Sequence, residues 1–273
     1  MTDPVTSSAG SAIMPDGASI AYTLHAGQGH ARPRIALIHS LALDRHVWDG
    51  VVPLLTPHAD VLTYDCRGHG QSSRVKMTYT LELFAGDLAS LLDHVKWPRA
   101  TVAGCSMGGC VAQAFAGVYP DRAERLAVID STAWYGPSAP KDWCDRAAVA
   151  ASEGFGALSA FQATRWVSDA FRAAHPEVVR AHMDVFLAND IGCYTATCEM
   201  LGDADLRHYQ AAMRLPASVV VGEQDYATPV AMSEQIHRAV TNSTLAVLPN
   251  VRHITPIECP AVIADKILEL LRR

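Results

Sequence analysis

The 273-residue chain has no long apolar run, no dense block of one charge and no paired cysteine pattern. No apolar stretch approaches the roughly 20 residues that cross a bilayer, so we expect no membrane partner. The 22 basic and 28 acidic side chains give a net charge of -6 without a run of lysines or arginines, which argues against nucleic acid as a partner. The seven cysteines form no CxxC pair and no Cys/His spacing suited to zinc, so we expect reduced thiols, mostly in the core, and no metal site.

The amino-terminal sequence MTDPVTSSAGSA lacks both the basic and the apolar stretch of a secretion signal. We therefore expect a loose tail at this end and a cytoplasmic protein. The length suffices for one large domain with a sizeable apolar core.

Short apolar runs alternate with helical patterns along the chain. Helical patterns begin at Thr80 and Pro260, and residues around 11–15 and 18–25 indicate an antiparallel edge hairpin. Continuous apolar runs are typical of strands covered on both faces, as in a parallel sheet. The alternation predicts an α/β fold with a mostly parallel, doubly wound sheet. Its predicted main strands are 34–40, 59–65, 100–105, 125–130, 217–222 and 243–248.

Residues 134–205 break this alternation. They contain no convincing strand, but they hold three of the five tryptophans and four of the six phenylalanines. We expect a helical lid, or cap, over a pocket, with plainly packed helices as the alternative. The predicted domains are thus 1–133 and 206–273, as two parts of the core, and 134–205 as the lid.

One serine lies between glycines directly after the predicted strand 100–105. Gly104-Cys105-Ser106-Met107-Gly108 fits Gly-x-Ser-x-Gly, a sharp strand-to-helix turn that lifts the hydroxyl above the sheet. The free N–H groups of the following helix favour negative charge at the same place. The motif therefore predicts that Ser106 is a nucleophile.

A serine nucleophile requires a base, normally a histidine oriented by a carboxylate. Asp225 follows the predicted strand 217–222, and His253 follows the next strand. Both lie at carboxyl ends of strands, where open α/β sheets build their sites. We predict that His253 is the base and Asp225 the acid, with Asp130 and Glu223 as alternatives for the acid.

Two backbone N–H groups are predicted to form an oxyanion hole. One belongs to Met107, next after the nucleophile, and the other to Leu41, in the loop after strand 34–40 with Ser40 as its neighbour. Glu258, five residues after His253, is expected to fasten the last helix.

Five segments follow one another in a recognisable order: IALIHSLALDRHVWD, VLTYDCRGHGQSS, GCSMGG, GEQDYATP and RHITPIECP. In this order and spacing the chain resembles the α/β-hydrolase family over nearly its whole length. Within the family it is most similar to 3-oxoadipate enol-lactonases and related esterases, through IHSLALDRHVWD and CEMLGDADLRHY. The resemblance implies an α/β-hydrolase fold and hydrolysis of a small-molecule ester or lactone through an acyl-serine, with no metal or organic cofactor.

Two positions depart from this likeness. Ala42 stands where the family loop usually has glycine, and Trp134 stands where a second lid arginine is expected besides Arg165. Arg165 is the predicted cation for a substrate carboxylate, and Trp134, Trp143 and Ser40 are predicted to line the substrate site. The missing arginine favours a less charged ester or lactone.

Three other functions remain open on the same fold. One is a cofactor-free haloperoxidase or perhydrolase, and another is a carbon-carbon bond hydrolase of ring-cleavage products. The third, a small-molecule binding or receptor protein, would turn over slowly or not at all.

Overall fold

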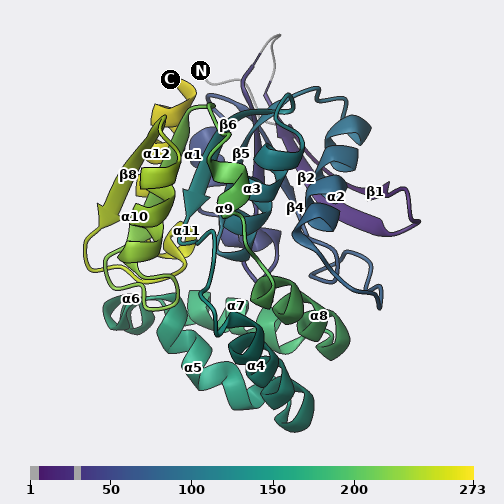
Figure 1. Cartoon of the computed structure of the whole chain (residues 1–273), viewed down its shortest axis with the longest axis vertical. Helices are drawn as coiled ribbons and strands as arrows, with labels where there is room; N and C mark the ends of the chain where they lie inside the picture. The colour runs from purple at the N-terminus through teal and green to yellow at the C-terminus, as the bar shows by residue number, and fades with distance from the viewer. Residues whose placement is uncertain (1–5, 28–31) are drawn as a thin grey trace.

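The computed structural model describes residues 6–27 and 32–273, and its centre is an eight-stranded sheet (Figure 1). The strands are β1 (Thr6–Ile13), β2 (Ser19–Ala26), β3 (Arg34–Ile38), β4 (Asp60–Tyr64), β5 (Ala100–Cys105), β6 (Ala123–Ile129), β7 (Ala217–Gly222) and β8 (Ser243–Leu248). Their order across the sheet is β1-β2-β4-β3-β5-β6-β7-β8. The strands from β3 to β8 pair in parallel, and β1 and β2 form an antiparallel edge. The predicted α/β class with a mostly parallel sheet is confirmed.

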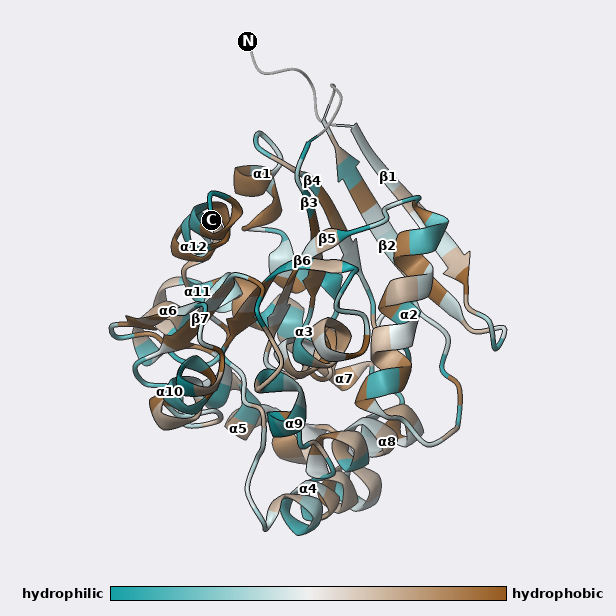
Figure 2. Cartoon of the chain, turned by 45° about the horizontal axis from the view of Figure 1, so that its top comes forward, coloured by the Kyte–Doolittle hydropathy of each residue, from teal (hydrophilic) through white to brown (hydrophobic). Residues whose placement is uncertain are grey.

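Helices cover both faces of the sheet (Figure 2). One face carries α1 (Val52–Leu55) and α12 (Pro260–Leu271), and the other carries α2 (Leu81–His94), α3 (Met107–Val118), α9 (Arg207–Gln210) and α10 (Val230–Ala239). Short helices η1 (Arg45–Trp48) and α11 (Thr255–Glu258) follow β3 and β8. Because both faces are covered, β5 and β7 are buried along their whole length, as their continuous apolar sequences predict. Within the described ranges, no helix is long and apolar enough to cross a membrane.

The amino-terminal strand is longer than the sequence predicted. Residues 6–13 pair with β2 from Thr6 opposite Ala26 to Ile13 opposite Ser19, so the expectation of a loose tail is wrong for this stretch. Nearly every β1 side chain is at least partly exposed, and an exposed edge strand requires no apolar pattern that could reveal it. The first five residues of the expected tail lie outside the described residues.

Of the helices between β6 and β7, the first five form a cap at the carboxyl ends of the parallel strands (Figure 1). They are α4 (Ala139–Glu153), α5 (Gly156–Trp166), α6 (Asp169–Ala174), α7 (Pro176–Leu187) and α8 (Ile191–Gly202). Phe155 packs edge-to-face against both Phe186 and Tyr194, and Trp166 packs in the same way against Phe186. These four aromatic residues of the segment 134–205 therefore form a small core inside the cap.

Hydrogen bonds join the cap to the loop that follows β8. The Ile254 N–H donates to the carbonyl of Trp166 at 2.8 Å. The Glu258 carboxylate accepts from the N–H of Ser168 at 3.1 Å and from the N–H of Arg252 at 3.0 Å. Glu258 thus ties the cap to this loop, and the expectation that it fastens the last helix is replaced by this contact.

Candidate active site

Ser106 occupies a sharp turn between β5 and α3, with φ 55° and ψ -116°. Non-glycine residues rarely adopt this conformation, so the surrounding structure must hold it. A β-carbon on Gly104 would overlap the carbonyl of Gly108, and one on Gly108 would overlap the carbonyl of Ile38. The two glycines of the motif are therefore required because α3 begins directly against β3 and β5.

The backbone of Ser106 is fixed on both sides of its α-carbon. Its N–H donates to the Ile129 carbonyl at 2.9 Å, and its carbonyl accepts from the Ser131 hydroxyl at 2.7 Å. The side chain stands at the N-terminus of α3, where the helix dipole and free N–H groups favour an anion.

Three predicted side chains form one continuous line of hydrogen bonds. The Ser106 Oγ lies 2.9 Å from His253 Nε2, and His253 Nδ1 lies 2.8 Å from Asp225 Oδ2. All three residues are buried. A neutral imidazole with its proton on Nδ1 donates to Asp225 and leaves Nε2 to accept the serine proton. The loops after β7 and β8 thus bring a carboxylate and a base to the serine.

Asp225 is arranged to remain ionised. Burial raises its pKa, but the charge of His253 and the hydrogen bonds from His253 and Thr228 outweigh this effect, so its pKa lies below its ordinary value. The carboxylate accepts from the N–H groups of Ala227 at 2.7 Å and Thr228 at 2.9 Å, and from the Thr228 hydroxyl at 2.8 Å. A charged Asp225 keeps the imidazole oriented and stabilises an imidazolium.

The two alternative carboxylates have other partners. Asp130, after β6, accepts from the N–H of Gly222 at 3.1 Å and from the N–H and hydroxyl of Thr255 at 2.9 and 2.7 Å. Glu223 is exposed and accepts from the Asn250 N–H at 3.1 Å. In the part of the chain that the structure describes, neither carboxylate hydrogen-bonds to His253.

The loop after β3, which carries Leu41, begins against the serine turn, since a β-carbon on Gly108 would lie 2.6 Å from the His39 carbonyl. Among the described residues, neither the Leu41 N–H nor the Met107 N–H donates to another group, so both are free for a ligand oxygen. Leu41 N–H shares a peptide plane with the Ser40 carbonyl, which accepts from His39 Nδ1 at 2.7 Å. His39 Nε2 in turn accepts from the Cys66 N–H at 2.8 Å, which fixes the tautomer and thereby the peptide.

Burial keeps His39 neutral. The ring is fully buried, and this desolvation is the main reason that its pKa lies below the ordinary value. A neutral ring has one donor and one acceptor, which match the Ser40 carbonyl and the Cys66 N–H. This role of His39 could not be predicted from the sequence, because its contacts with the Ser40 carbonyl and the Cys66 N–H form only in the folded loop.

The four predicted substrate-binding residues do not lie together. Trp143 and Arg165 line a cavity of about 210 Å³ between the cap and the loop after β7, with Ala227 on its core side. Ser40 lies in the loop after β3, next to Leu41. Trp134 lines a different cavity, where the Arg207 guanidinium stacks over its ring at 3.9 Å, so the structure does not bring it to Arg165.

A second arginine lines the cavity that Trp143 and Arg165 share. Arg146, on α4, donates from Nε to the Tyr194 hydroxyl at 2.7 Å and stacks on Trp143 at 5.1 Å. Within the described residues, no carboxylate forms an ion pair with Arg146 or Arg165. Burial, followed by the charge of Arg146, lowers the pKa of Arg165 to about 10, so the Arg165 guanidinium is charged at neutral pH. Sequence reasoning missed Arg146, which reaches this cavity only through the packing of α4 against α5.

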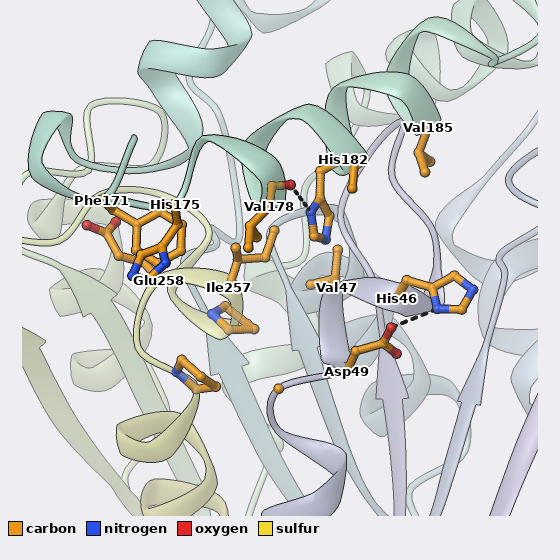
Figure 3. Close-up of a pocket in the computed structure, with 14 residues that line it drawn as sticks. His46, Val47, Asp49, Phe171, His175, Val178, His182, Val185, Ile257 and Glu258 are labelled. Carbon is orange, nitrogen blue, oxygen red and sulfur yellow. Dashed lines mark hydrogen bonds and ion pairs between the residues drawn. The ribbon is translucent and has the colours of Figure 1, made fainter. Parts of the chain in front are cut away.

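A larger cavity of about 680 Å³ lies elsewhere along the seam between cap and core (Figure 3). Helix α7 forms one wall with Val178 and Val185, and Val47 and Ile257 from the core face it. None of the predicted site residues lines this cavity. The hydrogen-bonded line of Ser106, His253 and Asp225 therefore lies outside this cavity.

Comparisons with known proteins agree with the observed fold. A sequence model of the alpha/beta hydrolase fold family matches residues 33–260. The chain is 30% identical to 3-oxoadipate enol-lactonase 2 of Acinetobacter baylyi over 242 residues, which cover 89% of this chain and 90% of the relative. Among solved structures, the enol-lactonase of Burkholderia xenovorans LB400 superposes with a TM-score of 0.92 and 32% identity, over 97% of this chain and 100% of that one. A thermophilic esterase of Thermogutta terrifontis with bound malate superposes with a TM-score of 0.88 and 27% identity, over 97% and 98% of the two chains.

Proposed function

Because the chain belongs to the α/β-hydrolase family and is thus a hydrolase, we propose that it cleaves a small carboxylic ester or lactone through an acyl-serine intermediate. The observation that carries this proposal is the line of hydrogen bonds from Ser106 through His253 to Asp225. The free N–H groups of Leu41 and Met107 beside the serine complete the set of groups that acyl transfer requires.

In the first half of the proposed reaction, His253 Nε2 takes the proton of Ser106 as the serine oxygen attacks the substrate carbonyl. The carbonyl oxygen becomes an oxyanion and accepts hydrogen bonds from the N–H groups of Leu41 and Met107. Collapse of this intermediate breaks the bond to the leaving oxygen, which receives the proton from His253. In a lactone the leaving oxygen stays attached to the acyl chain.

In the second half, His253 removes a proton from water, and the resulting hydroxide attacks the acyl-serine carbonyl. The same two N–H groups stabilise the second oxyanion. His253 then returns the proton to Ser106, which releases the carboxylic acid. Asp225 remains ionised and stabilises the imidazolium that forms in each half.

Ser106→Ala tests the mechanism directly. We expect turnover of a simple aryl ester to fall by about four to six orders of magnitude, because the triad acts as a unit. Circular dichroism should match the parent, since the methyl group fits where the hydroxymethyl group was. A folded Ser106→Ala variant that retains turnover would refute the acyl-serine mechanism. Turnover by the parent protein that depends on added peroxide would favour a perhydrolase.

For the substrate, we propose an ester or lactone that carries a carboxylate. Arg146 supplies a second cation beside Arg165, although Trp134 lies elsewhere. Asp142 also lines this cavity, but it accepts from the Ser138 hydroxyl and forms no ion pair with either arginine among the described residues. Two guanidinium groups without such a pair suit a substrate anion, which is costly to bury unpaired. Enol-lactonases among the relatives, and the esterase that holds malate, a dicarboxylate, support this choice.

Arg165→Ala tests the charge of the substrate. We expect activity on a carboxylated lactone to fall by about one to three orders of magnitude while neutral esters are spared, because a desolvated ion pair is lost. Arg207→Ala is the matched control, since it removes an arginine that stacks on Trp134 away from this cavity. Equal losses on charged and neutral substrates would reject the role of Arg165, and neutral esters that outpace every acid would indicate a general esterase.

A further inference from the structure

Ala42 holds an unusual conformation in the loop that carries the Leu41 N–H. Its φ is 57°, in the left-handed region where a β-carbon crowds the following carbonyl and which glycine enters freely. Without a contact that holds this conformation, an alanine favours negative φ. A change of φ at Ala42 would also rotate the peptide that joins it to Leu41, so the loop needs a contact that holds Ala42 in place.

One side chain of the cap makes such a contact. Asn189, between α7 and α8, donates from Nδ2 to the Ala42 carbonyl at 2.8 Å. Its amide is held by the end of α7, because the same nitrogen lies 2.9 Å from the Val185 carbonyl and 3.0 Å from the Phe186 carbonyl. The donor therefore comes from a fixed point of the cap.

Leu41 is thus held from both sides. On one side the Ser40 carbonyl accepts from His39, and on the other the Ala42 carbonyl accepts from Asn189. The Ala42 carbonyl shares a planar peptide with the Leu43 N–H, which donates to the Ser40 carbonyl at 3.3 Å, and the Ser40 carbonyl shares a planar peptide with the Leu41 N–H. The contact of Asn189 with Ala42 therefore reaches the Leu41 N–H through this turn.

We propose that Asn189 is a positioning residue, which holds the Leu41 N–H toward the oxyanion across the boundary between cap and core. This inference rests on the proposed acyl-serine mechanism, in which that N–H stabilises the tetrahedral intermediate. It assigns the cap a part in the chemical step in addition to enclosing the substrate.

Asn189→Ala is the first test. We expect kcat for a neutral aryl ester to fall about tenfold, equivalent to about 1.4 kcal/mol, with KM within about twofold of the parent. We expect kcat to change and KM to stay nearly constant because the Leu41 N–H binds the oxyanion more strongly than it binds the ester carbonyl. Affinity for an arylboronic acid, which forms a tetrahedral adduct with the serine, should fall about as much as kcat.

Ala42→Gly supplies the rescue. Glycine adopts φ 57° without the β-carbon penalty, so it needs the Asn189 contact less. We expect Ala42→Gly alone to stay within about twofold of the parent, and the double variant to regain at least half of the lost factor in kcat. If Asn189 only stabilised the end of α7, a glycine at position 42 in a different loop would not restore kcat.

Arg74→Ala is the matched control. Arg74 donates to the Ala188 carbonyl at 3.2 Å, so this variant removes a contact to the same end of α7 without touching the oxyanion loop. We expect its kcat and boronic acid affinity to equal those of the parent. An equal loss in Arg74→Ala, an unchanged kcat in Asn189→Ala, or no recovery in the double variant would each overturn the proposal. Ser106→Ala, measured alongside, separates the two questions, because a fully active Ser106→Ala would refute the mechanism itself.

Discussion

The loops after β6 and β7 each present an aspartate at the same edge of the sheet, and only one of them reaches the histidine. Asp130 and Asp225 are both buried, at 0% and 4% exposure. Asp225 accepts from His253 and from its own loop, whereas Asp130 accepts from Gly222 and Thr255. Asp130 thus joins the end of β7 to the segment after β8, and Asp225 orients the imidazole. Both residues are aspartates at the end of a strand, so these two features do not decide which carboxylate binds the histidine. The hydrogen-bonding groups that the neighbouring loops present to each carboxylate decide it.

The surroundings also set different protonation. Burial, followed by the charge of Asp225, raises the pKa of Asp130 well above its ordinary value. Asp225 has its pKa lowered because His253 and Thr228 outweigh burial. The two nearby carboxylates therefore differ in the direction of their pKa shift, which is upward for Asp130 and downward for Asp225.

Asp225→Asn should have the largest effect on activity. We expect kcat to fall by roughly 10³- to 10⁴-fold, because the amide cannot hold the imidazole in the required tautomer or stabilise its charge. Steady-state kinetics on an aryl ester measure the loss, with Asp130→Asn as the matched control. If Asp130→Asn costs more activity than Asp225→Asn, the two assignments must be exchanged.

Asp130→Asn should lower stability and leave kcat within about tenfold of the parent. The amide nitrogen cannot accept from Gly222 or Thr255, so a buried donor is left without a partner at a cost of about 1 to 3 kcal/mol. Urea unfolding of parent and variant measures this difference.

The pH dependence of that difference has a definite sign. The raised pKa means that Asp130 stabilises the fold fully below about pH 4, and this contribution is lost as the pH rises through the folded-state pKa. Asparagine does not titrate, so the gap in unfolding free energy between parent and variant should narrow as the pH rises above about 4. Asp225, with a lowered pKa, behaves oppositely, since its contribution is lost as the pH falls. A gap that widens with rising pH would contradict the raised pKa of Asp130.

A threonine beside each aspartate allows the smallest and most closely matched comparison. The Thr228 hydroxyl donates to Asp225 at 2.8 Å, and the Thr255 hydroxyl donates to Asp130 at 2.7 Å. Thr228→Val should lower kcat by roughly 3- to 10-fold, because one hydrogen bond to the ionised acid is lost. Thr255→Val should lower the melting temperature and change kcat by less than about twofold. Similar kinetic losses in both variants would show that the two carboxylates act on the histidine together.

Local sequence signals were sufficient for the elements that meet at the serine. The positions of Ser106, Asp225 and His253 each follow from one strand and the loop after it, so their arrangement could be anticipated without knowing how the cap packs. The sequence signal does not by itself decide between Asp130 and Asp225 as the acid, because both follow a strand at the same edge of the sheet. Only the hydrogen bonds of the folded loops distinguish them.

Contacts between distant segments could not be anticipated. Arg146 reaches Arg165 only through the packing of α4 beside α5, and Asn189 reaches Ala42 across 147 positions of sequence. Neither carries a spacing pattern, because a single polar residue on a helix or at its end is compatible with many surroundings. The edge hairpin around 11–15 and 18–25 was predicted, but residues 6–10 of β1 were missed for a related reason, since their exposed side chains follow no apolar pattern.

The cap is one uninterrupted insertion between β6 and β7, which invites its exchange with that of a relative. Two of its hydrogen bonds with the core fall on the loop of Ala42 and on the loop of His253. A chimaera that receives a foreign cap therefore changes the neighbours of both loops as well as the pocket. We expect that substrate range and turnover can be exchanged independently only if the core residues that contact Trp166 and Asn189 are transplanted with the cap.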